Sequence, residues 1–161
     1  MENQQMSYAG FWKRFVAFII DSILVSIVET VLLVPILAMS GITIFRAIAF
    51  DESPSEIVGM VMALIAAYLG WLLMTIVVSW LYFALMESSE RGATVGKLAL
   101  GIRVVDLSGK RISFARATGR YFAKILSSLI LMIGYLMAAF TDRKQALHDT
   151  IAGCLVINER A

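Results

Sequence analysis

The sequence predicts an all-α integral membrane protein. Of its 161 residues, 60% are hydrophobic and 16% are charged, and the mean hydropathy is +0.82. Such a composition is typical of chains that cross a bilayer, whose core takes about 20 apolar residues per helix. We expect a single membrane domain over residues 1–161, with two transmembrane helices, a third hydrophobic segment that spans or re-enters, and a small cytoplasmic β-hairpin-like element.

Two long apolar segments are the expected transmembrane helices. The first covers about residues 15–37, and Pro35 near its end suggests a kink or a stop. The second, 57–86, contains no formally charged residue. The first segment follows Lys13 and Arg14 as a signal peptide would, but it is longer than the apolar core of a signal peptide and carries acids. We interpret it as a retained anchor.

The third apolar segment, 125–141, is at the short end of the spanning range. If it spans once, the C-terminal tail lies outside. If it is a re-entrant or broken hairpin, the tail stays in the cytoplasm, which Arg143 and Lys144 favour. The stretches "GIRVVD" and "GCLVIN" are typical of short strands, with a turn expected at Ser108 and Gly109, and they can pair only on one side of the membrane. We therefore favour a cytoplasmic tail.

Basic residues are unevenly distributed between the connections. The stretch 87–124 contains eight Lys and Arg residues against three acids, whereas 39–56 contains Arg46 against three acids. The positive-inside rule places the long basic loop and the N-terminus in the cytoplasm. We expect a multi-pass protein of the inner (plasma) membrane, with the lipid bilayer as its first partner.

One face of the first helix is polar. At about 100° per residue, Asp21, Ser22, Ser26 and Glu29 share a side with Arg14. An ionised carboxylate in hydrocarbon costs about 2.5–3.5 kcal/mol on insertion scales, so Asp21 requires a partner. Arg14 lies about 10.5 Å away along the helix axis, too far for a direct ion pair. A third charged group is expected to complete the arrangement.

The basic loop contains a second group of candidate residues. Arg116, Arg120 and Lys124 recur every four residues on an expected helix over 113–124, forming a stripe suited to the anionic inner membrane surface. The alternative is an ordinary positive-inside flank.

The stretch "GATVGKL" is similar to a phosphate loop but lacks its spacing and its Ser or Thr after the lysine. We expect Thr94, Gly96 and Lys97 to shape a turn at the membrane surface.

Several functions are excluded by composition. Cys154 is the single cysteine and His148 the single histidine, so the chain has no thiolate cluster and little acid–base chemistry. We expect no metal, no cofactor and no enzymatic activity. The net charge of +2 gives no reason to expect nucleic-acid binding.

Three motifs in order resemble the RDD family of small membrane proteins. They are "RFVAFIID", then "TVGKLALGIRVVD" followed by "SGKRISFARATGR", and finally "ALHDTIAG", and together they cover nearly the whole chain. The resemblance places Arg14 at the head of the first helix, Asp21 within it, and Asp149 as the second aspartate, with Asp106 as the alternative. It implies a transport role, with some members linked to sodium/proton exchange.

Two functions remain open. In the first, the polar face binds a cation or proton along a transport path, and the residues involved are Arg14, Asp21, Ser22, Ser26, Glu29 and Asp149. Three short segments make a small transporter, so this function implies a homo-oligomer. In the second, Arg14, Asp21 and Asp149 form a buried structural network in a non-catalytic module that binds partner proteins in the membrane.

Overall fold

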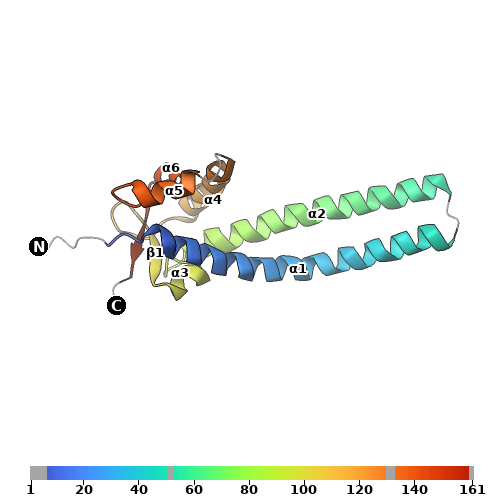
Figure 1. Ribbon diagram of the computed structural model, residues 1–161, viewed down its shortest axis with the longest axis horizontal. Coiled ribbons are helices and arrows are strands. Elements are labelled where there is room, and N and C mark those ends of the chain that lie inside the picture. Colours follow the sequence, from blue (N-terminus) through green and yellow to red (C-terminus); the bar gives the residue numbers. More distant parts are fainter. Residues whose placement is uncertain (1–6, 51–52, 130–132, 160–161) are drawn as a thin grey trace, which may run out of the picture. The chain divides into compact units, whose positions relative to one another are not determined.

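The computed structural model describes residues 7–50, 53–129 and 133–159. The elements are labelled in Figure 1 and are, in chain order, α1 (Phe11–Ala49), α2 (Pro54–Glu87), α3 (Val95–Ala99), β1 (Ile102–Asp106), α4 (Phe114–Leu129), α5 (Ile133–Phe140), α6 (Leu147–Ala152) and β2 (Cys154–Asn158). The chain forms two compact units. The head unit comprises the chain up to Ile23 and from Trp80 onward, and the helix-pair unit comprises Leu24–Ser79.

The two expected long helices are present. Both α1 and α2 are long and apolar enough to cross a membrane. Each extends beyond the predicted segment, and α1 continues through Pro35 to Ala49 without the expected stop. A proline inside a helix removes one backbone hydrogen bond, and the apolar residues that follow it continue the helical run.

The third apolar segment is not a single spanning helix. Its ends belong to α4 and α5, while residues 130–132 lie outside the described part. With eight residues, α5 is only about 12 Å long. The two helices pack closely, because a Cβ atom added to Gly134 would lie 2.8 Å from Cβ of Ser127. The described parts of the segment are therefore two helices that pack against each other.

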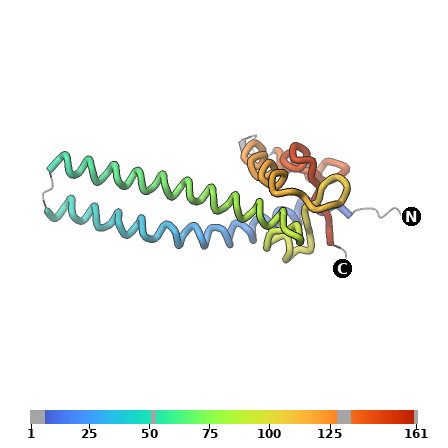
Figure 2. Tube along the Cα trace, turned by 180° about the vertical axis from the view of Figure 1, so that it is seen from behind, coloured from blue at the N-terminus to red at the C-terminus, as the bar shows by residue number. Residues whose placement is uncertain are grey.

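The predicted strand pairing is confirmed. β1 and β2 run antiparallel, with Ile102 opposite Asn158 and Asp106 opposite Cys154. Tyr8 forms a further bridge to β2, so the segment before α1 lies beside the C-terminal strand (Figure 2). The expected β-hairpin-like element is therefore present, with α4, α5 and α6 between its two strands in the sequence.

The turn after β1 also forms as expected. The Oδ1 atom of Asp106 accepts hydrogen bonds from the backbone N–H groups of Ser108 (2.8 Å) and Lys110 (2.9 Å). Gly109 has a φ of 81°, a left-handed conformation that glycine adopts at no steric cost.

An apolar core holds the head unit together. Its members come from the sheet, from the helices around it and from the segments that precede α1 and α4, and all are almost fully buried: Ala9, Ala17, Ala84, Ile102, Val104, Ile112, Ala117, Cys154 and Val156. The core fixes the first turns of α1, the last turns of α2 and helix α4 around the sheet. These are the elements that carry the charged residues described next.

Candidate functional site

The carboxylate of Asp21 is buried and surrounded by hydrogen-bond donors. The residue is 1% exposed. Its Oδ1 atom accepts from the Tyr82 hydroxyl on α2 and from the backbone N–H of Gly96 on α3, both at 2.7 Å. Its Oδ2 atom accepts from the Thr94 hydroxyl at 2.5 Å. A buried charge is tolerated when its lone pairs are hydrogen-bonded, so these donors supply the partner that the sequence left unidentified.

Gly96 allows α3 to approach α1 this closely. A Cβ atom at this position would collide with the carbonyl oxygen of Ala17 and would lie 3.0 Å from Cγ of Asp21. Thr94 and Gly96, which were expected to shape a turn at the membrane surface together with Lys97, are both buried and bind the carboxylate of Asp21.

Five charged side chains from five helices form a continuous ionic chain. Arg14 on α1 places Nη1 2.5 Å from Oδ2 of Asp149 on α6. Arg120 on α4 donates from Nε to Oδ1 of Asp149 at 2.8 Å, and its Nη1 lies 2.6 Å from Oε2 of Glu87 on α2. Lys97 on α3 places Nζ 2.5 Å from Oε1 of Glu87. Opposite charges therefore alternate from one end of the ionic chain to the other.

Burial and mutual attraction fix the protonation states of the side chains in this ionic chain. Burial alone would raise the pKa of Asp149, but Arg120 and Arg14 outweigh it and hold that pKa below its ordinary value. Burial would likewise lower the pKa of Arg120, and Glu87 and Asp149 raise it above the usual range. Burial lowers the pKa of His148 to about 3, so this imidazole is neutral at pH 7.

Lys124 lies beside the ionic chain. Its Nζ atom is 3.7 Å from Oε1 of Glu87 and 4.1 Å from the centroid of the Phe83 ring. Burial lowers the pKa of Lys124 to about 7. The attraction of Glu87 opposes this shift, and repulsion from Lys97 and Arg120 adds to it.

The structure divides the residues that the sequence had grouped together. Arg14 and Asp149 form an ion pair, but among the described residues no ion pair joins Arg14 to Asp21. Ser22 is half-buried, and Ser26 is exposed and belongs, like Glu29, to the helix-pair unit. The expected trio is therefore one pair and one separately bound aspartate.

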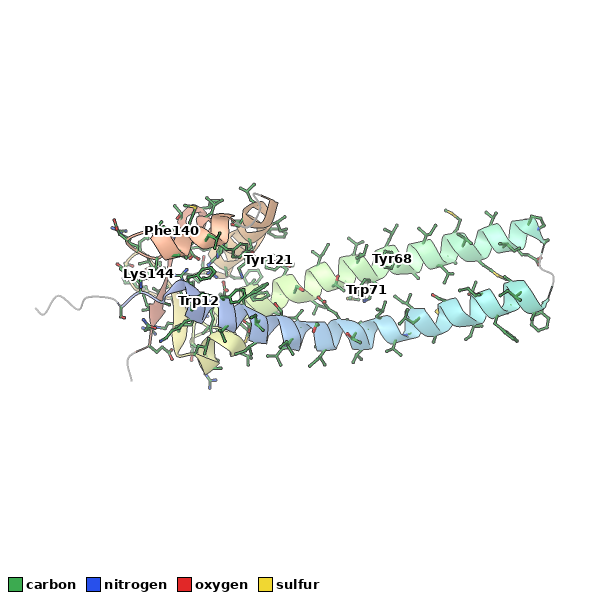
Figure 3. The ribbon with its side chains drawn as sticks, viewed as in Figure 1. Trp12, Tyr68, Trp71, Tyr121, Phe140 and Lys144 are labelled. Atoms are coloured by element: carbon green, nitrogen blue, oxygen red, sulfur yellow. The ribbon has the colours of Figure 1, made fainter. Side chains whose placement is uncertain are left out.

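Glu29 has its own partners within the helix-pair unit. Its Oε1 atom accepts from the Ser79 hydroxyl at 2.9 Å, and its backbone oxygen accepts from Nε1 of Trp71 at 3.3 Å. Trp71 and Tyr68 lie on α2 (Figure 3), with ring centroids 5.7 Å apart. The two hydrogen bonds to Glu29 join α2 to α1 at the level of its carboxylate.

The predicted basic stripe points mainly inward. Arg120 is 2% exposed and forms ion pairs with Glu87 and Asp149. Lys124 is half-buried, with Nζ 3.7 Å from Oε1 of Glu87. Arg116 alone follows the expectation of exposure, and it lies 3.7 Å from Asp106. The positive-inside rule treats such cations as surface groups, and the carboxylates that bind two of them were not anticipated.

Two important residues were missed from the sequence. Glu87 was counted only as an acid at the start of the basic loop, and Tyr82 only as part of an apolar segment. The available indication was Glu87 itself, an acidic residue that directly ends a long uncharged run. No sequence pattern identified Tyr82 as a donor to Asp21.

A cavity of about 390 Å³ lies within the head unit. Four cationic side chains face it, namely Arg14, Lys97, Arg120 and Lys124, and so does Asp21. Aromatic and aliphatic side chains from α1, α2 and α5 form most of the remaining wall, together with Ala146, His148 on α6 and Val156 on β2. Apolar walls with a few convergent polar groups are typical of ligand sites. Within the described residues, no cluster of His, Cys, Asp and Glu could hold a metal ion.

Comparisons with known proteins agree with the sequence motifs. The RDD family model matches residues 8–153. The uncharacterized protein YxaI of Bacillus subtilis strain 168 is 39% identical over 149 residues, which cover 92% of this chain and 96% of YxaI. The uncharacterized membrane protein YteJ of the same organism is 32% identical, over 96% of this chain and 83% of YteJ. No solved structure matches the chain.

Proposed function

Since this chain belongs to the RDD family of membrane proteins, we propose that it is a non-enzymatic binding module of the inner (plasma) membrane. In this proposal α1 and α2 anchor the protein, and the head unit holds a preformed binding cavity. Arg14, Asp21 and Asp149 maintain the shape of that cavity. They do not carry a transported ion.

The arrangement around Asp21 is the observation that supports this proposal. A site that takes up a metal cation presents oxygen acceptors to it. Asp21 instead accepts hydrogen bonds from Tyr82, Thr94 and Gly96, which are all donors here. The ionic chain from Arg14 to Lys97 is also internally paired. Groups arranged in this way stabilise a fold.

The distribution of charge supports a cytoplasmic head unit. Of the 14 Lys and Arg residues in the sequence, Arg46 is the one that falls within the helix-pair unit. By the positive-inside rule, the N-terminus, the sheet and α4 to α6 then lie on the cytoplasmic side. Trp12 and Phe140, labelled in Figure 3, are 73% and 86% exposed and are suited to the membrane interface.

A transport function is the second candidate, and Glu29 favours it. An ionisable residue in an apolar spanning helix is by default a candidate for ion or proton movement. Glu29 lies in α1 with Ser79 as its partner. Under this function a small cation or a proton would pass along α1, as in sodium/proton exchange. Two spanning helices enclose little space, so the path would require a homo-oligomer.

Flux measurements distinguish the two candidates. Purified protein is reconstituted into vesicles, and Na⁺ and H⁺ movement is followed under imposed gradients. The binding-module proposal expects the same flux as in protein-free vesicles. Flux that is present in the wild type and lost in Glu29→Gln would contradict the proposal and favour transport. Ser26→Ala is the matched control, because it alters the polar face of α1 without removing a charge.

A second measurement tests the structural role of Asp21. In Asp21→Asn the amide oxygen can still accept from Tyr82 and Gly96, and the amide N–H can donate to Thr94. We expect this variant to keep a folded head unit. Cys154 is 0% exposed, so slow thiol modification reports that the head unit is intact. Rapid modification of Cys154 in Asp21→Asn but not in the wild type would show that the charge of Asp21 is indispensable to the fold.

A further inference from the structure

The charged groups around the cavity carry one excess positive charge when Lys124 is protonated. Four cations, Arg14, Lys97, Arg120 and Lys124, face three carboxylates, Asp21, Glu87 and Asp149, while His148 is neutral. The two arginines are bound by carboxylates on more than one side. The excess therefore resides with the two lysines.

Both lysines share one carboxylate oxygen. Oε1 of Glu87 is 2.5 Å from Nζ of Lys97 and 3.7 Å from Nζ of Lys124. Both ammonium groups also line the cavity, and their N–H groups are donors that an anionic oxygen accepts. A monovalent anion in the cavity would supply acceptors to both and would neutralise the excess charge.

Most of the remaining cavity wall is apolar, and part of it reaches the surface. Phe15 and Phe18 on α1 are 43% and 45% exposed, and Leu136 on α5 is 46% exposed. Phe11 and Phe83 line the cavity with them. Because α1 is a candidate spanning helix, side chains exposed along it are suited to contact lipid. The site thus has a cationic end and an apolar rim.

The size of the cavity exceeds that of a small ion. A water molecule takes about 30 Å³ in the liquid, and typical ligand pockets measure about 300–1,000 Å³. At about 390 Å³, the cavity can hold a head group together with the beginning of a hydrocarbon chain. An occupant with one negative charge and an attached apolar tail matches both ends of the site.

We infer that this cavity binds the head group of an anionic phospholipid taken from the surrounding bilayer. The phosphodiester lies against Lys97 and Lys124, and the first part of the acyl chains lies along Phe15, Phe18 and Leu136. The inference rests on the proposed binding-module function and names its ligand. Inorganic phosphate shares the head-group chemistry but lacks the tail.

The test uses the full-length protein in a neutral detergent. Short-chain phosphatidylglycerol, short-chain phosphatidylcholine and inorganic phosphate are titrated separately, and the melting midpoint is followed. A ligand that binds the folded state raises this midpoint. We expect phosphatidylglycerol to raise the melting midpoint at concentrations at which phosphatidylcholine and inorganic phosphate leave it unchanged. The concentration that gives half of the shift measures the affinity.

Two variants of α4 form a matched pair for this titration. Lys124→Gln removes a cation that faces the cavity, and Arg116→Gln removes one from the exposed side of the same helix. A hydrogen bond to a charged group contributes enough that Lys124→Gln should weaken phosphatidylglycerol binding about tenfold or more. Arg116→Gln should change it less than about twofold.

A third variant probes the apolar end without altering any charge. Leu136→Trp enlarges a side chain at the rim and should weaken phosphatidylglycerol binding while leaving the ionic chain intact. Equal midpoint shifts with phosphatidylcholine and phosphatidylglycerol would overturn the inference, as would phosphate binding as tightly as phosphatidylglycerol. Neither result would produce ion flux in vesicles, so failure of the lipid inference is distinguishable from failure of the proposed function.

Discussion

Arg14 and Asp149 lie 135 residues apart in the sequence and form an ion pair, with Nη1 2.5 Å from Oδ2. The pair ties the first turns of α1 to α6, close to the C-terminal strand. Arg14 also donates from Nε to the backbone oxygen of Ala9 at 3.0 Å. The other oxygen of Asp149 is bound by Arg120. A single buried carboxylate therefore joins three helices of the head unit.

The first prediction concerns this pair. Removing one partner leaves the other charge buried without compensation, which commonly costs about 3–5 kcal/mol. We expect Arg14→Ala and Asp149→Ala each to lower the free energy of unfolding by an amount in this range, measured by denaturant titration in detergent. The double variant should lose less than the sum. Arg14→Lys should also destabilise, because an ammonium cannot reproduce the guanidinium geometry.

The second prediction follows from the separate environment of Asp21. Asp21→Ala leaves the Tyr82, Thr94 and Gly96 donors without an acceptor and should cost about 2–5 kcal/mol. Because Asp21 and Asp149 share no partner in the described structure, their alanine variants should be additive to within about 0.5 kcal/mol. Thr94→Val should instead be coupled to Asp21→Ala. Coupling between the two aspartates would return Asp21 to the network first expected from the sequence.

The sequence predicted the long helices and the sheet because their physical causes are local. Apolar runs of sufficient length identify α1 and α2, and β-branched runs identify the two strands. The charged site was harder, since helical periodicity places Arg14 and Asp21 on one face without identifying what faces them. Their actual partners, Asp149 and Tyr82, come from distant segments.

The inward orientation of Arg120 illustrates the same limit. A cation in a basic loop satisfies the positive-inside rule whether it faces lipid, water or a buried acid. The inward orientation of Arg120 is defined by its ion pairs with Glu87 and Asp149. Such long-range pairing depends on the tertiary fold, which a reading of local patterns does not provide.

The third prediction concerns the pH dependence of lipid binding. The pKa of Lys124 lies at about 7, with Glu87, Lys97, Arg120 and Asp149 as its charged neighbours. An anionic head group favours the protonated lysine, so affinity for phosphatidylglycerol should be high below pH 7 and fall as the pH rises through this value. Titration of the melting midpoint between pH 6 and pH 9 measures the effect.

Lys124→Arg is the control for this pH dependence. Arginine remains protonated over the whole range, so binding to this variant should vary little with pH. In the absence of ligand, the lowered pKa of Lys124 makes the stability of the wild-type fold change with pH in the opposite direction to the lipid affinity. The folded state binds fewer protons than the unfolded chain between about pH 7 and the ordinary pKa of about 10.4, so stability should rise with pH there. A wild-type affinity that is constant between pH 6 and pH 9 would rule out Lys124 as the titrating contact.

The last prediction concerns the side of the membrane on which the head unit lies. Leu107, in the turn after β1, is 53% exposed, and Phe50, just after α1, is 67% exposed. Each is replaced by cysteine, and the native Cys154 can remain because it is fully buried. A cytoplasmic head unit requires Leu107→Cys to resist a membrane-impermeant maleimide in intact cells and to react after permeabilisation. If α1 crosses the membrane once, Phe50→Cys should react in intact cells.

The wild type controls for labelling of Cys154. Labelling of Leu107→Cys together with protection of Phe50→Cys would invert the topology, and equal behaviour of both would show that α1 does not cross.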